Sequence, residues 1–343
     1  MFRTSLLLLL LTGFTTQAAT AQLLGRDVTL PPELRLRPAG EIELQYSDLF
    51  DINRCILKQG TVSGLLVHLP PQLEGRIYYG SWELEANPPR PRLRRGPRLQ
   101  DGATELNLAS LTHYPNDIAD FGGRQEGDLF LQFEIWDETA AEVVILHRTV
   151  HFRVQNGLFQ RTVTLVAPPF YSCVVEAGLP LPVISFAADR PVDARVLVAG
   201  VEPFVSQQGQ RRHEVKLPGL PPQTTYVYRV ELNAPDETIL SREYTFTTPP
   251  LPGAGEPFRA ILMSDSRAGV GAGTHAVEGV NHAVLSQLAA NAWRLDPDLL
   301  LFPGDLINGW CDQPDAFRRQ LRSFKSALSF LSPTVPIFTG IGN

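Results

Sequence analysis

The sequence contains little that points to a membrane or to nucleic acid. After residue 21 it has no apolar run long enough to cross a bilayer as a helix. Charged residues make up only 19% of its 343 residues and the net charge is −6, which argues against nucleic acid as the main partner. We therefore expect no transmembrane span and no nucleic acid as the main partner. The sequence leaves the oligomeric state open.

Cysteine is also scarce, with only Cys55, Cys173 and Cys311 in the whole chain. No cysteine directly follows the N-terminal apolar run, so a lipid anchor is not expected. An exported protein can keep disulfides, and a bridge between Cys55 and Cys173 is one interpretation. Three reduced or buried thiols is the other, and the sequence does not decide between them.

Residues 1–21 have the pattern of a secretory signal peptide. Arg3 supplies the positive charge, and Leu6 to Leu11 form an apolar core too short for a stable membrane anchor. Ala19-Thr20-Ala21 is a small-x-small cleavage site. The pattern predicts a mature chain that begins at Gln22 and is exported to the periplasm or the extracellular space.

Two stretches of alternating polar and apolar residues predict β-sandwich modules. The first covers residues 22–165 and includes the alternating runs 75–85 and 129–136. The second covers residues 167–250, where Leu220, a Pro-rich turn and Tyr226 resemble the tyrosine corner of fibronectin type III-like domains. Neither module shows a catalytic pattern, so each is a candidate for binding rather than chemistry.

One segment of the first module is unusually basic. Residues 88–101 contain five arginines interleaved with prolines. Such a run can bind polyanions. A solvated loop is the interpretation that we prefer.

A Pro/Gly-rich linker at residues 251–257 leads to a last segment, 258–343, in which short apolar runs alternate with stretches of helical period. The order strand, helix, strand, helix, strand predicts a parallel sheet with right-handed crossovers. The predicted fold class is therefore two N-terminal β-sandwich modules followed by the first half (βαβαβ) of an α/β domain.

Three polar side chains follow the three predicted strands of this segment. They are Asp265, Asp305 and Asn343. Ligands of parallel sheets bind at the carboxyl ends of the strands, so we expect these side chains to converge on one edge. Carboxylate and amide oxygens are hard donors, and the sequence therefore predicts a metal site formed by these three residues.

The order of the motifs in this segment resembles the calcineurin-like metallophosphoesterases, whose pattern is Asp-x-His, then Gly-Asp, then Gly-Asn-His. The matching stretches are Ser264-Asp265-Ser266-Arg267, Gly304-Asp305 and Gly342-Asn343. A fibronectin-like module ahead of them resembles the arrangement of purple acid phosphatases.

The resemblance implies an exported hydrolase that cleaves a phosphoester substrate by attack of a hydroxide held between two metal ions of the Fe, Mn or Zn class. Asp305 would bridge the ions, Asp265 would bind the first and Asn343 the second.

The chain departs from this pattern in three places. Arg267 stands where the family has a metal-binding His, and it is interpreted either as a contact to the substrate phosphate or as the partner of a nearby carboxylate. Asn308 replaces the tyrosine ligand of purple acid phosphatases. The family's catalytic His would follow Asn343, so no catalytic residue is assigned.

With so few ligands, we expect this chain to be an incomplete and inactive form. Asn281 and His282, at the start of the first predicted helix, are further candidates to reach the same edge. The alternative is a non-catalytic exported β-sandwich binding protein that carries a vestigial phosphoesterase segment.

Overall fold

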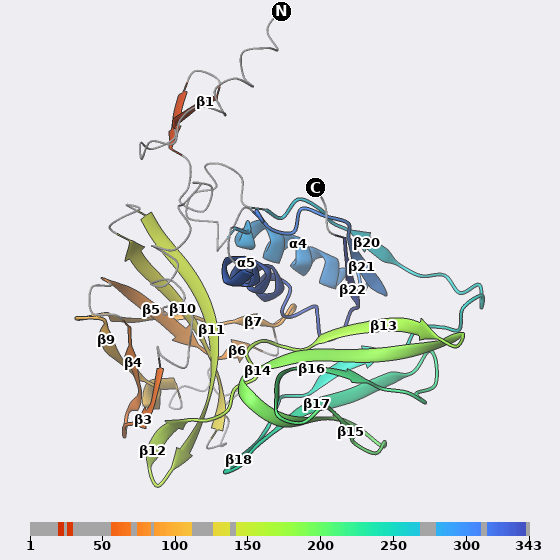
Figure 1. Ribbon diagram of the computed structural model, residues 1–343, viewed down its shortest axis with the longest axis horizontal. Coiled ribbons are helices and arrows are strands. Elements are labelled where there is room, and N and C mark those ends of the chain that lie inside the picture. Colours follow the sequence, from red (N-terminus) through yellow and green to blue (C-terminus); the bar gives the residue numbers. More distant parts are fainter. Residues whose placement is uncertain are drawn as a thin grey trace, which may run out of the picture.

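Strands dominate the chain and form three groups, each with a hydrophobic core of its own (Figure 1). The computed structural model describes residues 20–23, 26–29, 56–69, 74–83, 86–111, 126–137, 142–267, 279–309 and 314–340. Ahead of the first group, β1 (Thr20–Leu23) and β2 (Arg26–Thr29) pair as an antiparallel hairpin.

The first group places two antiparallel sheets around one core. One sheet has the order β12-β11-β10-β5-β8, and the other has the order β3-β4-β9. Alternate residues of β10, such as Leu129 and Phe133, point into the core, where Leu65 and Leu106 of the second sheet meet them. The elements are β3 (Ile56–Gly60), β4 (Gly64–His68), β5 (Glu74–Gly80), β8 (Arg94–Arg98), β9 (Ala103–Asn107), β10 (Glu126–Asp137), β11 (Glu142–Gln155), β12 (Leu158–Arg161), a short pair β6 (Trp82–Glu83) and β7 (Arg90–Pro91), and a 3-10 turn at Ala109–Leu111.

The second group depends on one long strand, β14 (Leu179–Val198), which takes part in two layers. Its first half pairs with β13 and β16, and after a register shift between Ala187 and Val192 its second half pairs with β15 and β17. Tyr228 and Phe246 fill the space between the layers. The other strands are β13 (Phe170–Glu176), β15 (Phe204–Val205), β16 (Gln210–Lys216), β17 (Thr225–Ala234), β18 (Glu237–Leu240) and β19 (Tyr244–Thr247).

The third group is a parallel sheet with the order β20-β21-β22 and two helices. Its elements in chain order are β20 (Ala260–Leu262), α4 (His282–Arg294), β21 (Leu299–Phe302), α5 (Pro314–Ala327) and β22 (Ile337–Thr339). Leu285 and Ala289 of α4 and Phe324 of α5 pack with Leu300 and Phe302 of the central strand. In Figure 1 both helices lie on the same side of the three strands.

The predicted fold class is wrong for this last segment. Strands make up about half of the described residues, which include only two α-helices. A parallel sheet of an α/β domain has helices on both faces. Here the opposite face carries Leu262, Leu301 and Phe338, which are 70%, 40% and 41% exposed. The segment is therefore a two-layer unit in a mostly β protein, not half of an α/β domain.

The structure also bears on the predictions about a membrane span, the cysteines and the basic segment. The described residues include no helix of the length and hydropathy that a membrane span requires. Cys173 on β13 is a free thiol, whereas Cys55 and Cys311 lie outside the described residues. The basic segment, interpreted above as a loop, contributes the strands β7 and β8. The boundaries 22–165, 167–250 and 258–343 stay predictions.

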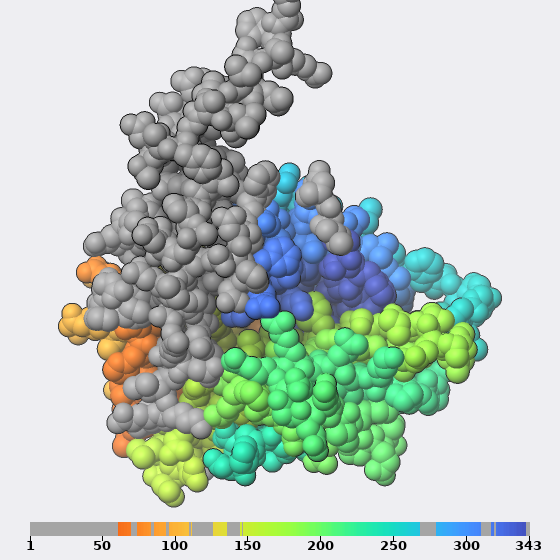
Figure 2. Space-filling model, viewed as in Figure 1, coloured from red at the N-terminus to blue at the C-terminus, as the bar shows by residue number. Residues whose placement is uncertain are grey.

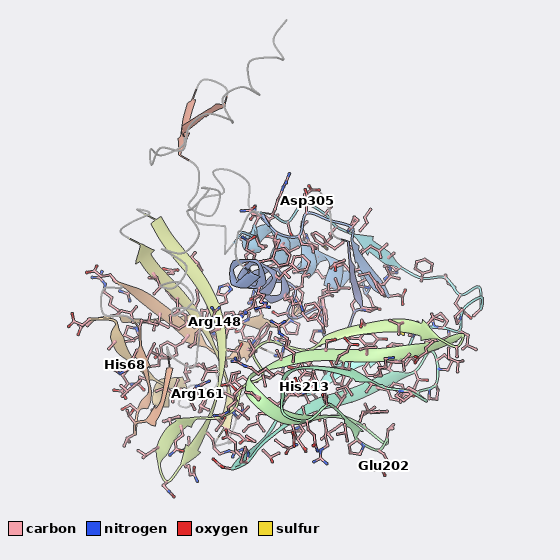
Figure 3. All side chains as sticks on the ribbon, in the orientation of Figure 1. His68, Arg148, Arg161, Glu202, His213 and Asp305 are labelled. Atoms are coloured by element: carbon pink, nitrogen blue, oxygen red, sulfur yellow. The ribbon has the colours of Figure 1, made fainter. Side chains whose placement is uncertain are left out.

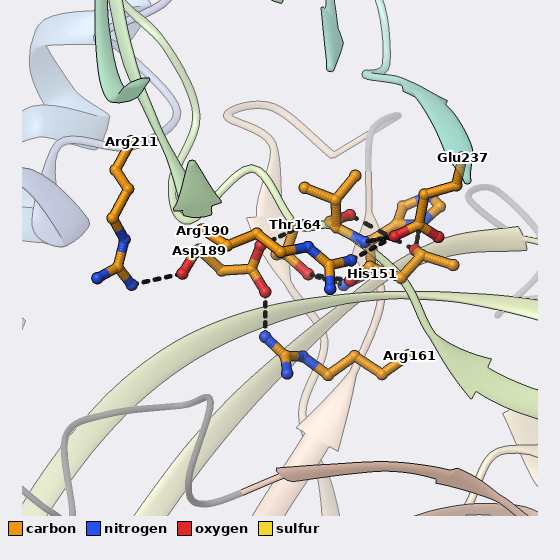
Figure 4. Close-up of polar contacts among 9 residues, drawn as sticks. His151, Arg161, Thr164, Asp189, Arg190, Arg211 and Glu237 are labelled. Atoms are coloured by element: carbon orange, nitrogen blue, oxygen red, sulfur yellow. Dashed lines mark hydrogen bonds and ion pairs between the residues drawn. The ribbon is translucent and has the colours of Figure 1, made fainter. Parts of the chain in front are cut away.

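A buried carboxylate joins the first two groups (Figure 4). Asp189 of β14 pairs with Arg161, the last residue of β12, and also accepts a hydrogen bond of 3.0 Å from the backbone N–H of Thr164. Its own N–H donates to the carbonyl of Thr164 at 3.0 Å. Beside it, Glu237 pairs with Arg190 and accepts the N–H of Val163 at 2.8 Å. These contacts fix the chain where it passes from one group to the other.

A second joint seats the third group on the second, and in Figure 2 the blue atoms of the former lie against the green atoms of the latter. The backbone N–H of Tyr171 donates to Ser332 at 2.8 Å, and the hydroxyl of Tyr228 donates to the carbonyl of Pro333 at 3.1 Å. The Ser332 hydroxyl donates to Pro169, and the ammonium group of Lys325 lies 4.8 Å from the centre of the Phe170 ring. These contacts attach the third group to the second, as the contacts of Asp189 attach the second group to the first.

We expect Asp189→Ala to be among the most destabilising single changes in the second group. The side chains of Asp189 and Arg161 are 0% and 5% exposed, so the change removes the carboxylate that pairs with a buried guanidinium, at a cost of about 3–5 kcal/mol. Urea unfolding followed by circular dichroism measures the loss. Glu176→Ala, which breaks the exposed pair with Lys216, is the control and should leave the midpoint unchanged. Equal midpoints for the two variants would contradict the role given to Asp189.

Candidate functional site

The loops that follow β20 and β21 lie side by side. The backbone N–H of Arg267 donates to the carbonyl of Asp305 at 3.1 Å, and the Ser266 hydroxyl donates to the carbonyl of Leu306 at 2.6 Å. These bonds bring Asp265 and Asp305 to one edge of the third group, and Figure 3 shows Asp305 at the outer side of that group. We call the surface formed by Asp265, Arg267 and Asp305 the carboxylate edge.

Both aspartates have an unusual backbone conformation. The φ angles are +60° at Asp265 and +53° at Asp305, in the left-handed region of backbone conformations that residues other than glycine rarely adopt. Asp tolerates this conformation better than most residues do, but each such residue still costs about 1 kcal/mol or more. Five other described non-glycine residues share a positive φ, and the two aspartates differ from them in being the positions that the sequence predicts as metal ligands.

Arg267 pairs with one of the two carboxylates. Its Nη1 lies 3.4 Å from Oδ2 of Asp305, with the arginine side chain 47% exposed and the aspartate 14% exposed. This is the second of the two interpretations of Arg267 given above. A contact between Arg267 and a substrate phosphate stays a prediction.

Two asparagines beneath the edge have unsatisfied polar atoms. The N–H of Asn281 donates to Ser266 at 2.8 Å, and the N–H of Asn308 donates to Gly279 at 3.0 Å. Yet Oδ1 of Asn281 and Nδ2 of Asn308 are buried without a hydrogen-bond partner. An unpaired buried polar atom costs about 1–3 kcal/mol, so such atoms call for an explanation: a water molecule could satisfy either atom, and a cation could bind only Oδ1 of Asn281.

The third predicted ligand, Asn343, lies outside the described residues. The last described residue is Gly340, whose N–H donates to the carbonyl of Phe302 at 2.8 Å beside the end of β21. A Cβ at Gly340 would lie 2.1 Å from the carbonyl oxygen of Pro303, so only glycine fits there. The third strand therefore approaches the edge on which Asp305 lies.

The side chains of the carboxylate edge fit one hard divalent cation better than two. Two carboxylates and the nearby asparagine amides are oxygen donors of the kind that Mg²⁺, Mn²⁺ and Ca²⁺ prefer. Across the described ranges no three His, Cys, Asp or Glu residues gather into a group that could hold a metal ion. The guanidinium of Arg267 competes with a cation for Asp305. The two-metal centre that the resemblance implies stays a prediction.

His282 lies elsewhere than the sequence suggested. Its ring contacts His147 of β11, with the ring centres 4.7 Å apart and the planes at 70°. Burial lowers the pKa of His282 to about 4, and burial together with the charges of His282 and Arg148 lowers the pKa of His147 to about 3. No local pattern reveals this pair, because its members are far apart in the sequence.

Comparison of the chain with models of known protein families and with curated proteins finds no match. The resemblance to calcineurin-like metallophosphoesterases therefore depends on the motifs alone.

The neutral histidine pair predicts a loss of stability in acid. Unfolded imidazoles titrate near 6.5, whereas the folded ones titrate near 4 and 3, so between pH 6.5 and 4 the unfolded chain binds more protons. The free energy of unfolding should therefore fall as the pH is lowered through this range. Asp128 has its pKa raised to about 6, mainly by burial, and opposes this trend.

The test compares the wild type with a variant that carries both His147→Gln and His282→Gln, because Asp128 is common to the two. Urea unfolding at several pH values between 6.5 and 4 should give a shallower decline for the variant. Parallel declines would show that the two imidazoles are not buried in the neutral form.

The backbone of Asp265 predicts an unusual order of stability among its variants. Glycine accepts the left-handed conformation and alanine does not, so Asp265→Gly should be more stable than Asp265→Ala by about 1 kcal/mol. Thermal or urea unfolding measures the difference. At Asp236, an exposed turn residue outside the left-handed set, the order should reverse. The same order at both positions would contradict the strained backbone at Asp265.

Proposed function

We propose that the carboxylate edge binds a divalent metal ion and that the chain is part of an exported metal-dependent phosphoester hydrolase. The observation that supports this is the placement of Asp265 and Asp305, both in the left-handed conformation, at the carboxyl ends of adjacent parallel strands. Hydrogen bonds between the two loops bring both residues to one edge, where a cation could bind the two carboxylates together. The motif order supports a phosphoester as the substrate class, and the signal-like residues 1–21 support export.

Each side chain of the edge has a task in this proposal. Asp265 and Asp305 hold the ion, which when bound would act as a Lewis acid toward a phosphoryl oxygen. Arg267, half exposed and next to Asp305, presents a planar set of donors that suits two oxygens of a phosphate group. With an ion bound at Asp305, the Arg267 guanidinium would be available to contact the substrate phosphate.

Binding without turnover is the expected behaviour of the chain itself. Hydrolysis by two metal ions needs more ligands than Asp265 and Asp305 supply, and the leaving group needs a proton donor. His282 is not available for that task, because it is buried against His147. We therefore expect the cation to bind and phosphatase activity to be absent.

The alternative, a non-catalytic binding protein, is favoured by one observation. The Arg267–Asp305 ion pair already neutralises one carboxylate of the edge, as a decayed metal site would. If the chain is a non-catalytic binding protein, the edge has no affinity for divalent ions. A direct measurement of metal binding therefore distinguishes the two proposals.

We expect Mn²⁺ to bind the full chain at one site, measured by isothermal titration calorimetry, and to raise the unfolding temperature. The variant with both Asp265→Asn and Asp305→Asn should lose both effects, because its amides carry no charge. Asp236→Asn, an exposed change of the same chemistry, is the control and should bind as the wild type does.

Arg267→His sharpens this test, since it removes the competing cation and adds a nitrogen ligand. The affinity for Mn²⁺ should rise at least about tenfold, equivalent to about 1.4 kcal/mol. No binding by the wild type and no gain in Arg267→His would leave the non-catalytic alternative as the better account.

A further inference from the structure

The two loops of the carboxylate edge are joined by hydrogen bonds before and after the aspartates. Before them, the last bond of the ladder between β20 and β21 runs from the N–H of Met263 to the carbonyl of Leu301, at 3.0 Å. After them, the hydroxyl of Ser266 donates to the carbonyl of Leu306 at 2.6 Å. Both aspartates therefore lie between two points at which the loops are tied together.

The bond from Ser266 acts directly on the two strained residues. Ser266 follows Asp265 in the chain and Leu306 follows Asp305, so one hydrogen bond joins the residues next to both positions of positive φ. Strained backbone of this kind persists only where surrounding contacts hold it in place. The loss of the Ser266 hydroxyl would leave the backbone of both aspartates freer to relax.

Ser266 is itself held firmly. It is 6% exposed, so water competes little for its hydroxyl. Its carbonyl accepts the N–H of Asn281, at the start of α4, at 2.8 Å. The N–H of the next residue, Arg267, donates to the carbonyl of Asp305 at 3.1 Å. Ser266 thus connects the loop after β20 with the loop after β21 and with the start of α4.

A second serine of the same loop provides a natural comparison. The hydroxyl of Ser264 lies 3.5 Å from the carbonyl of Gly304, and Ser264 is exposed. A contact of that length, open to water, is weak. Ser264 and Gly304 directly precede the two aspartates, whereas Ser266 and Leu306 directly follow them. Of the two serines, only Ser266 makes a short and buried bond across the edge.

We propose that Ser266 is a positioning residue of the carboxylate edge. Its hydroxyl holds Asp265 and Asp305 in the left-handed conformations in which the two carboxylates bind one cation, and it does not itself contact the cation. The statement about the cation rests on the proposed function, whereas the statement about the backbone does not. Two experiments test these statements separately.

The first experiment needs no metal and compares Asp265→Gly with Asp265→Ala in two backgrounds by urea unfolding. In the Ser266→Ala background position 265 is no longer held at positive φ, so the advantage of glycine over alanine should fall to less than about half of its value in the wild-type background. In the Ser264→Ala background the advantage should stay the same. An undiminished advantage in the Ser266→Ala background would overturn the proposal, whether or not a metal binds.

The second experiment titrates the full chain with Mg²⁺ and with Ca²⁺ by calorimetry. Mg²⁺ requires nearly ideal octahedral geometry, whereas Ca²⁺ accepts flexible sites, so Ser266→Ala should lower the affinity for Mg²⁺ at least about tenfold and that for Ca²⁺ less than about threefold. Ser264→Ala should bind both ions as the wild type does. A loss of stability alone would not change the ratio of the two affinities. The unfolding temperature confirms that each variant is folded.

The outcomes distinguish this inference from the proposed function. No binding of either ion by the wild type would overturn the metal site, and the unfolding comparison would still decide whether Ser266 holds the aspartates. Binding by the wild type with the same Mg²⁺ affinity in Ser266→Ala would overturn the role of Ser266 and leave the metal site in place. Equal losses for Mg²⁺ and Ca²⁺, or equal losses in Ser266→Ala and Ser264→Ala, would also overturn that role.

Discussion

The arrangement of this protein depends on a buried carboxylate. Asp189 has no solvent exposure, and it is stabilised by the guanidinium of Arg161 and by the backbone N–H of Thr164. A buried charge without such partners is very unfavourable, so the chain can pass from the first group to the second only in a geometry that brings these residues together. The second group in turn holds the third through Tyr171 and Tyr228. His147 of the first group and His282 of the third then lie in ring contact.

The carboxylate edge follows from a different constraint. Parallel pairing of β20 with β21 places the two following loops next to each other, and hydrogen bonds from Arg267 and Ser266 fix them. The chain then accepts two left-handed aspartates, Asp265 and Asp305, that it could have avoided with glycine. Five other described non-glycine residues also have a positive φ, so the proposed role in binding depends on the position of these two aspartates at adjacent strand ends as well as on their strain. Arg267 meanwhile balances the charge of Asp305 in the absence of a ligand.

Sequence patterns predicted part of this structure because alternation and helical period report which side of an element is buried. The alternating run 129–136 lies within β10, and the polar residues Asp265 and Asp305 follow adjacent parallel strands. The same patterns could not show what covers the other face of a sheet. Leu262, Leu301 and Phe338 belong to apolar runs typical of strands buried on both sides, and the α/β prediction failed on that point.

The rest of the site depends on features that have no local pattern. A positive φ at an aspartate leaves no trace in the residues around it, and His147 meets His282 only through the packing of two separate groups. Prolines and arginines in residues 88–101 suggested a loop, because edge strands such as β8 often carry the same residues. The outcome for Asn343 lies beyond the described residues.

The most direct test of the proposed metal site is anomalous diffraction from crystals of the full chain soaked in Mn²⁺ and measured at the manganese absorption edge. The account predicts an anomalous peak within about 2.5 Å of carboxylate oxygens of both Asp265 and Asp305, with the Arg267 guanidinium turned away from Asp305. An edge without a peak, with the ion pair between Arg267 and Asp305 intact, would contradict it.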